Sequence, residues 1–464
     1  MLSFIHPKRW RPELILLLAG AAITRLWSLL QPNAVVFDEV YFKAFAGHYL
    51  DGHYFFDIHP PLAKLLLAGW AHVVGLSSSD VLNSTAATMR FLPAIAGVLI
   101  VPVFWGILRR LGATRPFAFL GAAALLLDNA LLVESRFILM DSMLLLFGLS
   151  AFYFYLVGRE QRGNWRWLAV AAAAILAGAA MSTKWTGLTA LALVGLLWLG
   201  DWRGRKFSLG RNLGELAVLL IIPLAVYVSA FWVHFQLLPH SGDGDAFMST
   251  TFQETLVDSP TYNPQTKLSF WGKFGELNSV MYRSNQTLTA THPYGSRWYT
   301  WPLELRPIYY WAGDVDGQAN QGNIYLLGNP IVWWGTLIAV AVGAGYAWLR
   351  RIKLRPATVG ALAAAGVAYL MNFLPFVGVP RVMFLYHYFF SFIFSVMFAV
   401  MLWNDLATPH HGDHGQLATA NRKWIYGGVL AAVLLGFLFF APLSYGTPLS
   451  PAGLAAHMWL PSWR

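Results

Sequence analysis

The chain has 464 residues, of which 57% are hydrophobic and only 12% are charged, with a formal net charge of +10. Soluble proteins carry about twice this share of charged residues, which excludes an ordinary soluble enzyme. Cysteine is absent, which excludes disulfides, thiolate metal sites and thiol nucleophiles. The Lys and Arg residues form short clusters between apolar runs. This pattern indicates a polytopic membrane protein in the lipid bilayer, and no nucleic-acid partner is expected.

Long apolar runs, each close to the roughly 20 residues of one helical crossing, predict about eleven membrane spans. The first run follows Lys8, Arg9 and Arg11. Because no small-residue cleavage site follows, we expect a retained span rather than a signal peptide. The expected spans are residues 12–31, 89–109, 115–134, 137–157, 166–182, 184–200, 213–236, 329–349, 356–375, 381–403 and 424–443.

The basic clusters predict the orientation of these spans. They fall in every loop on the side of the N-terminus, which the positive-inside rule assigns to the cytoplasm. The chain is therefore expected to comprise an N-terminal transmembrane module (1–236) with a catalytic first outer loop (32–88), an extracytoplasmic lobe (237–328) and a C-terminal transmembrane module (329–464). Residues 39–50 and 61–75 have helical apolar spacing but are too short to span, so interfacial helices are expected there.

The first outer loop begins with two adjacent carboxylates, Asp38 and Glu39, just beyond the first span. A group transfer at a membrane surface needs a base that takes a proton from the acceptor, and Asp38 is placed to supply it. Glu39 has two open interpretations. It binds the acceptor, or it is a helix N-terminal carboxylate stabilised by the helix dipole.

Four cationic residues follow at the outer ends of other spans. Each could anchor its span at the interface, but together they predict a convergent phosphate site. Two histidines are further donor-site candidates with structural alternatives: His59 as a cap beside a Pro-Pro pair, and His387 as a residue of the helical core. Glu134 or Asp141 is expected to pair with the nearby Arg136. The four cationic candidates are Arg90, Arg136, Lys184 and Arg381.

Several sequence blocks resemble the protein O-mannosyltransferases, which are polyprenyl-phosphate-mannose-dependent enzymes of the membrane glycosyltransferase superfamily with the C-type (GT-C) fold. The blocks run in order along most of the chain. They are Phe37-Asp38-Glu39-Val40-Tyr41-Phe42, Asp57-Ile58-His59-Pro60-Pro61-Leu62-Ala63-Lys64, Leu127-Asp128-Asn129, Ser135-Arg136-Phe137-Ile138-Leu139-Met140-Asp141-Ser142, Lys184-Trp185-Thr186-Gly187-Leu188, Ile324-Tyr325-Leu326-Leu327-Gly328-Asn329-Pro330 and Phe384-Leu385-Tyr386-His387-Tyr388.

The resemblance implies an all-α polytopic enzyme of eleven spans, with Asp38 as catalytic base. It also implies that Arg90 matches the family's essential Arg and that Lys184 and His387 lie in blocks lining the donor site. The implied donor is mannose on a dolichyl or shorter polyprenyl phosphate, and the implied acceptor is a Ser or Thr hydroxyl of an exported polypeptide. Such a donor is already activated, so no cofactor is expected. No metal site is expected either, because the His-rich stretch 409–414 is interpreted as solvated.

Eukaryotic members of this family carry a β-trefoil domain that residues 237–328 are too short to hold. This difference points to a bacterial member in the cytoplasmic (inner) membrane, with its active site facing the periplasm. Homodimer formation and association with the secretion machinery are further partner hypotheses. Two rival functions remain open: the same donor chemistry with a lipid, polysaccharide or different sugar, and a transporter or flippase. No inverted repeat supports the second rival.

Overall fold

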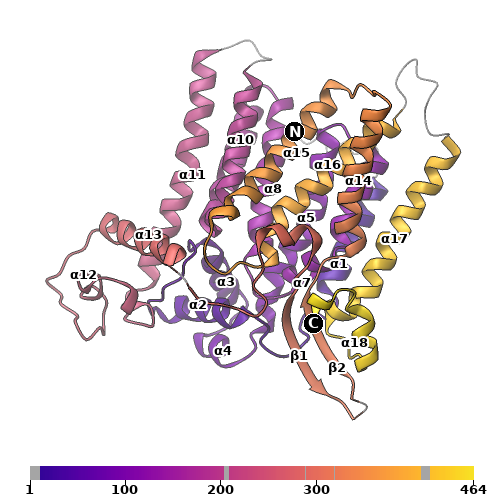
Figure 1. Cartoon of the computed structure of the whole chain (residues 1–464). Coiled ribbons are helices and arrows are strands. Elements are labelled where there is room, and N and C mark those ends of the chain that lie inside the picture. Colours follow the sequence, from indigo (N-terminus) through magenta and orange to yellow (C-terminus); the bar gives the residue numbers. More distant parts are fainter. Residues whose placement is uncertain (1–10, 203–207, 288, 318, 409–418) are drawn as a thin grey trace.

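The computed structural model describes residues 11–202, 208–287, 289–317, 319–408 and 419–464. Long helices form a bundle, and shorter elements gather at one of its ends (Figure 1). In the first half the helices are α1 (Pro12–Leu26), α2 (Glu39–Asp51), α3 (Leu62–Val73), α4 (Ser78–Asn83), α5 (Phe91–Arg110), α6 (Arg115–Leu126), α7 (Asn129–Arg136), α8 (Asp141–Glu160), α9 (Gly163–Thr183), α10 (Leu188–Asp201) and α11 (Leu209–Leu237).

The second half contains a small hairpin as well as helices. Its elements are α12 (Thr250–Gln253), α13 (Phe270–Thr287), β1 (Ile308–Val315), β2 (Gln321–Leu326), α14 (Pro330–Leu349), α15 (Pro356–Phe373), α16 (Phe389–Ala407), α17 (Thr419–Tyr445) and α18 (Pro451–His457). Short 3₁₀ turns flank several of them, at Ala87–Arg90, Trp185–Gly187, Asp245–Phe247, Trp298–Leu303, Leu374–Gly378, Leu385–Tyr388 and Pro461–Trp463.

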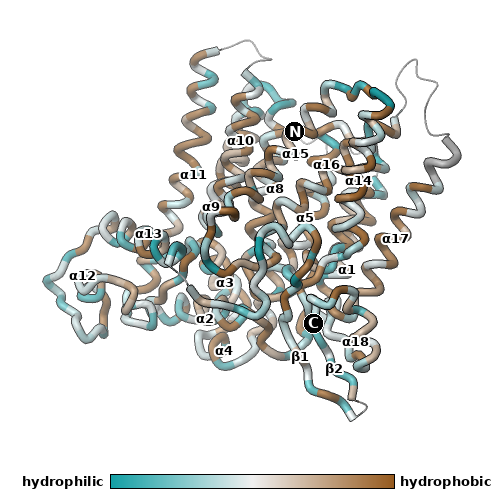
Figure 2. The backbone as a smooth tube through the Cα atoms, viewed as in Figure 1, coloured by the Kyte–Doolittle hydropathy of each residue, from teal (hydrophilic) through white to brown (hydrophobic). Residues whose placement is uncertain are grey.

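The chain is a multi-pass membrane protein. Within the described residues, eight helices are long and apolar enough to cross a bilayer, and a ninth crossing is counted if the bent pair α6 and α7 forms one span. Hydrophobic residues dominate these long helices, whereas hydrophilic residues gather at both ends of the bundle (Figure 2). The eight are Ala87–Arg110, Asp141–Glu160, Gly163–Thr183, Leu209–Leu237, Pro330–Leu349, Pro356–Gly378, Leu385–Ala407 and Trp424–Tyr445.

The predicted number of eleven spans is not confirmed. Two expected spans correspond to shorter helices, α1 with 15 residues and the apolar segment Trp185–Asp201. A third, 115–134, is broken between α6 and α7, which bend by 55°. The break lies at Asp128, whose carboxylate accepts the N–H of Leu131 and so caps the start of α7.

The all-α prediction is correct except for one hairpin. β1 and β2 pair antiparallel, with Ile308 opposite Leu326 and register shifts after Tyr309 and Ala312. The two short helices expected in the first outer loop are present as α2 and α3. A capping box at Ser77 and Asp80 adds α4 to the same loop.

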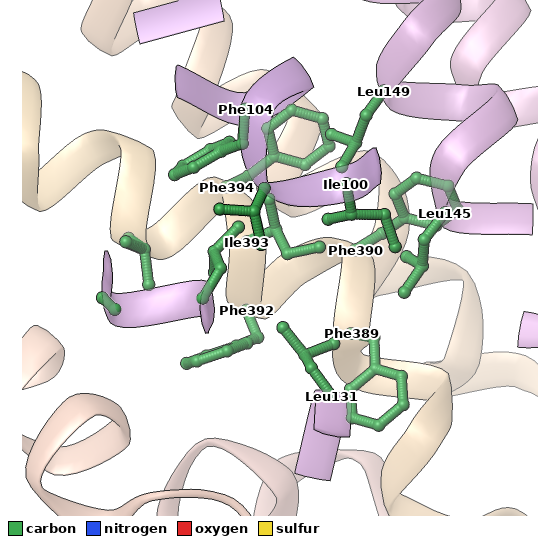
Figure 3. Packing of buried hydrophobic residues seen from close by; sticks show 14 of the residues in the cluster. Ile100, Phe104, Leu131, Leu145, Leu149, Phe389, Phe390, Phe392, Ile393 and Phe394 are labelled. Atoms are coloured by element: carbon green, nitrogen blue, oxygen red, sulfur yellow. The ribbon is translucent and has the colours of Figure 1, made fainter. Parts of the chain in front are cut away.

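The core lies where α5, α8 and α16 meet. Ile100, Leu145, Phe390 and their neighbours interdigitate there (Figure 3). Small residues permit this close approach, because a Cβ added at Gly148 would lie 2.6 Å from the ring of Phe390. Tight packing at small residues is the usual basis of helix association in membranes, where burial of apolar surface gives little net drive. The outer loops therefore rest on a rigid bundle.

Two buried arginines join the ends of helices near the first outer loop. Arg25 donates to the carbonyls of Leu125 and Leu126 at the end of α6. Arg136 donates to the carbonyls of Arg25, Trp27 and Ser28 at distances of 2.6 to 3.1 Å. The last carbonyls of a helix have no partner inside the helix, and a cation there also opposes the negative end of the helix dipole. Together the two arginines fix the point from which the first outer loop departs.

Candidate active site

Asp38 lies immediately before α2, at the start of the first outer loop. The preceding residue, Phe37, has a φ of 49°, in the left-handed region that bulky residues rarely adopt. Its ring stacks on Tyr310 of β1 with the centroids 4.3 Å apart, which holds the chain in this turn. Strained backbone of this kind is concentrated at functional sites.

The carboxylate of Asp38 is half-buried and accepts no hydrogen bond from any side chain or backbone group among the described residues. Burial raises the pKa of Asp38 to about 6, with further increases from the nearby carboxylates of Asp141 and Asp57 and an opposing decrease from Lys184. A carboxylate that is uncommitted and more basic than usual is well suited to accept a proton near neutral pH.

Lys184 stands beside this carboxylate at a break between α9 and α10. Its extended backbone, with φ −144° and ψ 147°, ends α9. The ammonium pairs with Asp141 at the start of α8, with Nζ 2.6 Å from Oδ2, and lies 5.0 Å from the ring centroid of Tyr386. Asp141 thereby orients the ammonium of Lys184, which is largely buried.

Cationic residues lie around His59, which is in the stretch between α2 and α3. Burial, and then the positive charges of Lys184, Arg381 and Lys64 together with His387, hold the pKa of His59 well below its usual value. Lys64 is itself paired with Asp57 and donates to the carbonyl of His59 at 2.7 Å. Four predicted donor-site residues thus lie near enough for the others to influence His59 electrostatically: His59, Lys184, Arg381 and His387.

Two of these residues, Lys184 and His387, also line a cavity of about 320 Å³ among α8, α10, α15 and α16. Its polar groups, including Lys184, Asp141 and His387, share the lining with many apolar side chains. This volume falls in the usual range for small-ligand sites. The apolar part is lined by Leu144, Leu145, Trp185, Met371, Pro375, Phe376, Val379, Phe389 and Phe390. A ligand with an anionic head and an apolar tail matches this division.

Arg90, Glu39 and Arg136 occupy different places from those expected. Arg90 and Glu39 are both 0% exposed, and the guanidinium donates to both carboxylate oxygens at 2.8 Å. Arg90 also donates to the carbonyls of Pro32 and Ala34. Arg136 donates its hydrogen bonds to carbonyls at the end of α1. The structure therefore places these two arginines outside the cation group around His59, because buried carbonyls and a buried carboxylate already use their donors.

Glu39 is equally committed. Besides Arg90, it accepts the backbone N–H groups of Val36 and Ile138. These bonds engage both of its oxygens and join the first outer loop to the segment between α7 and α8. Its side chain is therefore not available to an incoming acceptor, and the alternative interpretation as a structural carboxylate of the α2 N-terminus fits its contacts.

The expected pairing of Glu134 or Asp141 with Arg136 is wrong. Asp141 pairs with Lys184, and Glu134 accepts a hydrogen bond from the hydroxyl of Tyr310 at 2.7 Å. Sequence reasoning missed Tyr310 because nothing local marks a strand residue as the partner of a helix 176 positions away. It also missed the Asp57–Lys64 pair, although the spacing of seven residues, from the loop into the first turn of α3, was a usable signal.

The arrangement combines a free base, a group of cations and a mainly apolar cavity. It can deprotonate a hydroxyl while the cations stabilise an anionic leaving group. Within the part of the chain that the structure describes, no group of three or more His, Asp or Glu residues could hold a metal ion. The His-rich stretch 409–414 lies outside the described residues.

Comparison with known proteins gives matches along most of the chain. Residues 15–239 match the family described as dolichyl-phosphate-mannose-protein mannosyltransferase, and residues 270–463 match the C-terminal four TMM region of protein-O-mannosyltransferase. Dolichyl-phosphate-mannose–protein mannosyltransferase 4 of Candida albicans is 35% identical over 287 residues, which are 56% of this chain and 38% of the relative. The chain therefore spans less than half the length of that relative.

A bacterial relative matches over nearly its whole length. The polyprenol-phosphate-mannose–protein mannosyltransferase of Mycolicibacterium smegmatis is 28% identical over 502 residues, covering 96% of this chain and 91% of the relative. The solved S. cerevisiae Pmt1-Pmt2 complex bound to the sugar donor has a TM-score of 0.86 at 22% identity, covering 100% of this chain and 93% of that one. This similarity confirms the predicted GT-C fold.

Proposed function

Because the chain belongs to the protein O-mannosyltransferase family, we propose that it transfers mannose from a polyprenyl phosphate to Ser or Thr hydroxyls of exported polypeptides. The observation that carries the proposal is the placement of the uncommitted carboxylate of Asp38 beside Lys184. Lys184 belongs both to the cation group around His59 and to the lining of the cavity. Base and leaving-group site are thus adjacent.

The donor would bind with its phosphate against His59, Lys184, Arg381 and His387, and with its prenyl chain along the apolar part of the cavity. A prenyl phosphate is an activated leaving group, so the cations need only stabilise the charge that develops as it departs. Lys184 is held for this role by Asp141. Arg381 is half-buried and has no hydrogen-bond partner among the described residues, so its guanidinium is free to grip a phosphate.

Transfer would then take place in a single displacement. The acceptor hydroxyl attacks the anomeric carbon while Asp38 takes its proton, and the bond from that carbon to the phosphate oxygen breaks with its electron pair leaving on the prenyl phosphate. Attack opposite the leaving group inverts the configuration, so a β-linked mannosyl phosphate gives an α-mannoside. Proximity and orientation of the three reacting groups supply much of the acceleration.

The residues Arg90, Glu39 and Arg136 would not touch the substrates but would position the loop that carries Asp38. Glu39 joins Arg90 to the backbone of Val36, two residues before Asp38, and to that of Ile138. Arg136 fixes the end of α1, from which the loop departs. The buried network thus sets the position of the base relative to the bundle, and a catalytic group must be held to within a fraction of an ångström for efficient reaction.

The proposed location is a bacterial cytoplasmic membrane, with the site on the periplasmic side. The elements α2, α3, α4 and the hairpin gather at one end of the bundle (Figure 1). The basic residues at the C-terminal ends of α5 and α14, including Arg109, Arg110 and Arg350, lie at the other end. Basic loops favour the cytoplasm, which supports an extracytoplasmic position for the proposed catalytic loop.

The test is incubation of the purified enzyme with labelled polyprenyl-phosphate-mannose and a Ser/Thr-rich peptide. Labelled mannose is expected on the peptide in an alkali-labile α-linkage, with release of polyprenyl phosphate. Transfer of the label to a lipid or polysaccharide acceptor but not to the peptide would instead establish the rival acceptor class. Absence of any transfer from this donor, with donor binding shown, would contradict the proposed reaction.

A further inference from the structure

Three aromatic side chains from distant parts of the chain meet beside Asp38. The ring of His292 lies edge-on to Phe37, with centroids 6.4 Å apart, and edge-on to Phe384, with centroids 5.1 Å apart. Phe37 and Phe384 also contact each other at 6.3 Å. We refer to these three residues as the aromatic rim. Phe37 and Phe384 are half-buried and His292 is exposed, so the rim forms part of the surface.

The rim is held rigidly on two sides. Phe37 stacks on Tyr310, whose hydroxyl is bonded to Glu134 of α7. On the other side, the N–H of Ser296 donates to the carbonyl of Met383 at 2.8 Å, which joins the segment of His292 to that of Phe384. A surface built from fixed rings binds a partner with little loss of conformational entropy on its own side.

His292 contributes a hydrogen-bond donor to this surface. Its Nδ1 accepts the backbone N–H of Tyr294 at 3.2 Å, so in the neutral ring the proton resides on Nε2. No group among the described residues accepts a hydrogen bond from Nε2. The rim therefore presents apolar rings together with one N–H that lacks an acceptor.

The position of the rim joins the two parts of the reaction. Phe37 directly precedes the proposed base Asp38. Phe384 is close in sequence to Tyr386 and His387, which line the cavity. The Nδ1 atom of His387 lies 3.2 Å from the backbone nitrogen of Phe384. A molecule seated on the rim would thus lie beside the residue that precedes the base and beside the segment that carries His387, as the acceptor must.

We propose that the aromatic rim is the subsite for the acceptor polypeptide and that His292 donates a hydrogen bond from Nε2 to a backbone carbonyl beside the reacting Ser or Thr. This inference rests on the proposed function. A carbonyl is the chemical match because the donor is neutral, whereas the phosphate is matched by the cations around His59. The rings of Phe37 and Phe384 would pack against the extended peptide backbone and its small side chains.

The test uses three His292 variants of the full-length enzyme, each titrated separately with labelled polyprenyl-phosphate-mannose and with a Ser/Thr peptide. His292→Ala and His292→Phe should raise the peptide KM about tenfold, as expected for one lost hydrogen bond, with the donor KM unchanged. His292→Phe keeps an aromatic ring, so its defect isolates the N–H donor. His292→Gln, which restores an N–H, should recover part of the affinity. The matched control is His72→Ala at an exposed histidine of α3.

A rise in donor KM instead of peptide KM would assign the rim to the donor and overturn the proposal, and so would unchanged kinetics in the folded variants. A second measurement does not depend on turnover. A photoreactive benzophenone amino acid in place of His292 should cross-link to the peptide, and the same substitution at His72 should not. If the wild-type enzyme transfers no mannose to peptide, the proposed function fails, whereas absence of cross-linking at position 292 refutes the rim.

Discussion

Arg90 and Glu39 form a fully buried ion pair that holds the first outer loop. The guanidinium Nε lies 2.8 Å from Oε1 of Glu39, and both side chains are completely shielded from solvent. The pair also joins the carbonyls of Pro32 and Ala34 and the N–H groups of Val36 and Ile138 into one network. The turn that carries Asp38 therefore depends on two fully buried residues whose polar groups are already paired.

Replacement of Arg90 by Lys should disrupt this hydrogen-bond network and destabilise the fold. An ammonium cannot reproduce the parallel hydrogen bonds of a guanidinium to a carboxylate, and the orphaned carbonyls would remain buried. Disrupting a buried pair costs about 3–5 kcal/mol, so we expect a markedly lower unfolding temperature in detergent and a matching loss of activity. The fraction that remains folded should keep a near-normal donor KM. A stable Arg90→Lys enzyme with a raised donor KM would show that Arg90 binds phosphate after all.

Asp38→Asn should abolish turnover and leave donor binding intact. The amide is nearly isosteric with the carboxylate but cannot take the acceptor's proton, and a general base contributes about 100- to 10,000-fold. Donor affinity can be measured with labelled polyprenyl-phosphate-mannose in the absence of peptide. A variant that retained a tenth of the wild-type rate would identify another residue as the base.

The raised pKa of Asp38 predicts opposite effects of pH on activity and on stability. Activity should fall as the pH drops through about 6, the pKa to which burial raises this carboxyl, because the protonated acid cannot accept a proton. The ionised form is disfavoured in the folded protein, so its destabilising effect is complete above pH 6 and disappears below the ordinary pKa of 3.8.

Thermal unfolding of Asp38→Asn tests the second effect. The variant should be more stable than the wild type at pH 8, and the difference should shrink at pH 5. Equal unfolding temperatures at both values would show that burial does not perturb this carboxyl.

Much of the candidate site could be predicted from the sequence because the predicted topology assigns its residues to one side of the membrane. Asp38, His59, Lys184, Arg381 and His387 all lie at the same ends of apolar segments, and alternating orientation brings such ends together. The order of spans alone places them on one side of the membrane, and the packing of the bundle brings them near one another. The pairing of Lys184 with Asp141 did not follow, because Arg136 is closer to Asp141 in sequence and only the extended backbone at Lys184 brings its ammonium there.

The roles of the buried arginines were beyond sequence reasoning for a physical reason. Arg136 is bound to backbone carbonyls, and Arg90 is bound to backbone carbonyls as well as to Glu39. Every residue carries the same carbonyl, so no residue type marks these backbone acceptors. The hairpin was missed for a related reason. Its side chains, such as Tyr310 and Ile324, are buried against the bundle, and this contact rather than a strand-like pattern stabilises it.

Arg381→Ala should weaken use of the donor with little effect on folding. Arg381 has no hydrogen-bond or ion-pair partner among the described residues, so its removal leaves no buried group unsatisfied. Loss of a charge-assisted contact to phosphate should raise the donor KM about tenfold or more, with the peptide KM unchanged. Arg283→Ala, at an exposed arginine of α13, is the control and should behave as wild type. An unchanged donor KM for Arg381→Ala would remove this residue from the phosphate site.

Single cysteines should report which side of the membrane each end of the bundle faces. The chain contains no cysteine, so one introduced thiol is unique. Thr251 lies in α12 beside the outer elements, and Ser208 lies at the start of α11 at the opposite end; both are exposed. If the basic loops are cytoplasmic, Thr251→Cys should react with a membrane-impermeant maleimide in intact spheroplasts, and Ser208→Cys should react only after permeabilisation. The reverse pattern would place Asp38 in the cytoplasm and rule out transfer to polypeptides after their export.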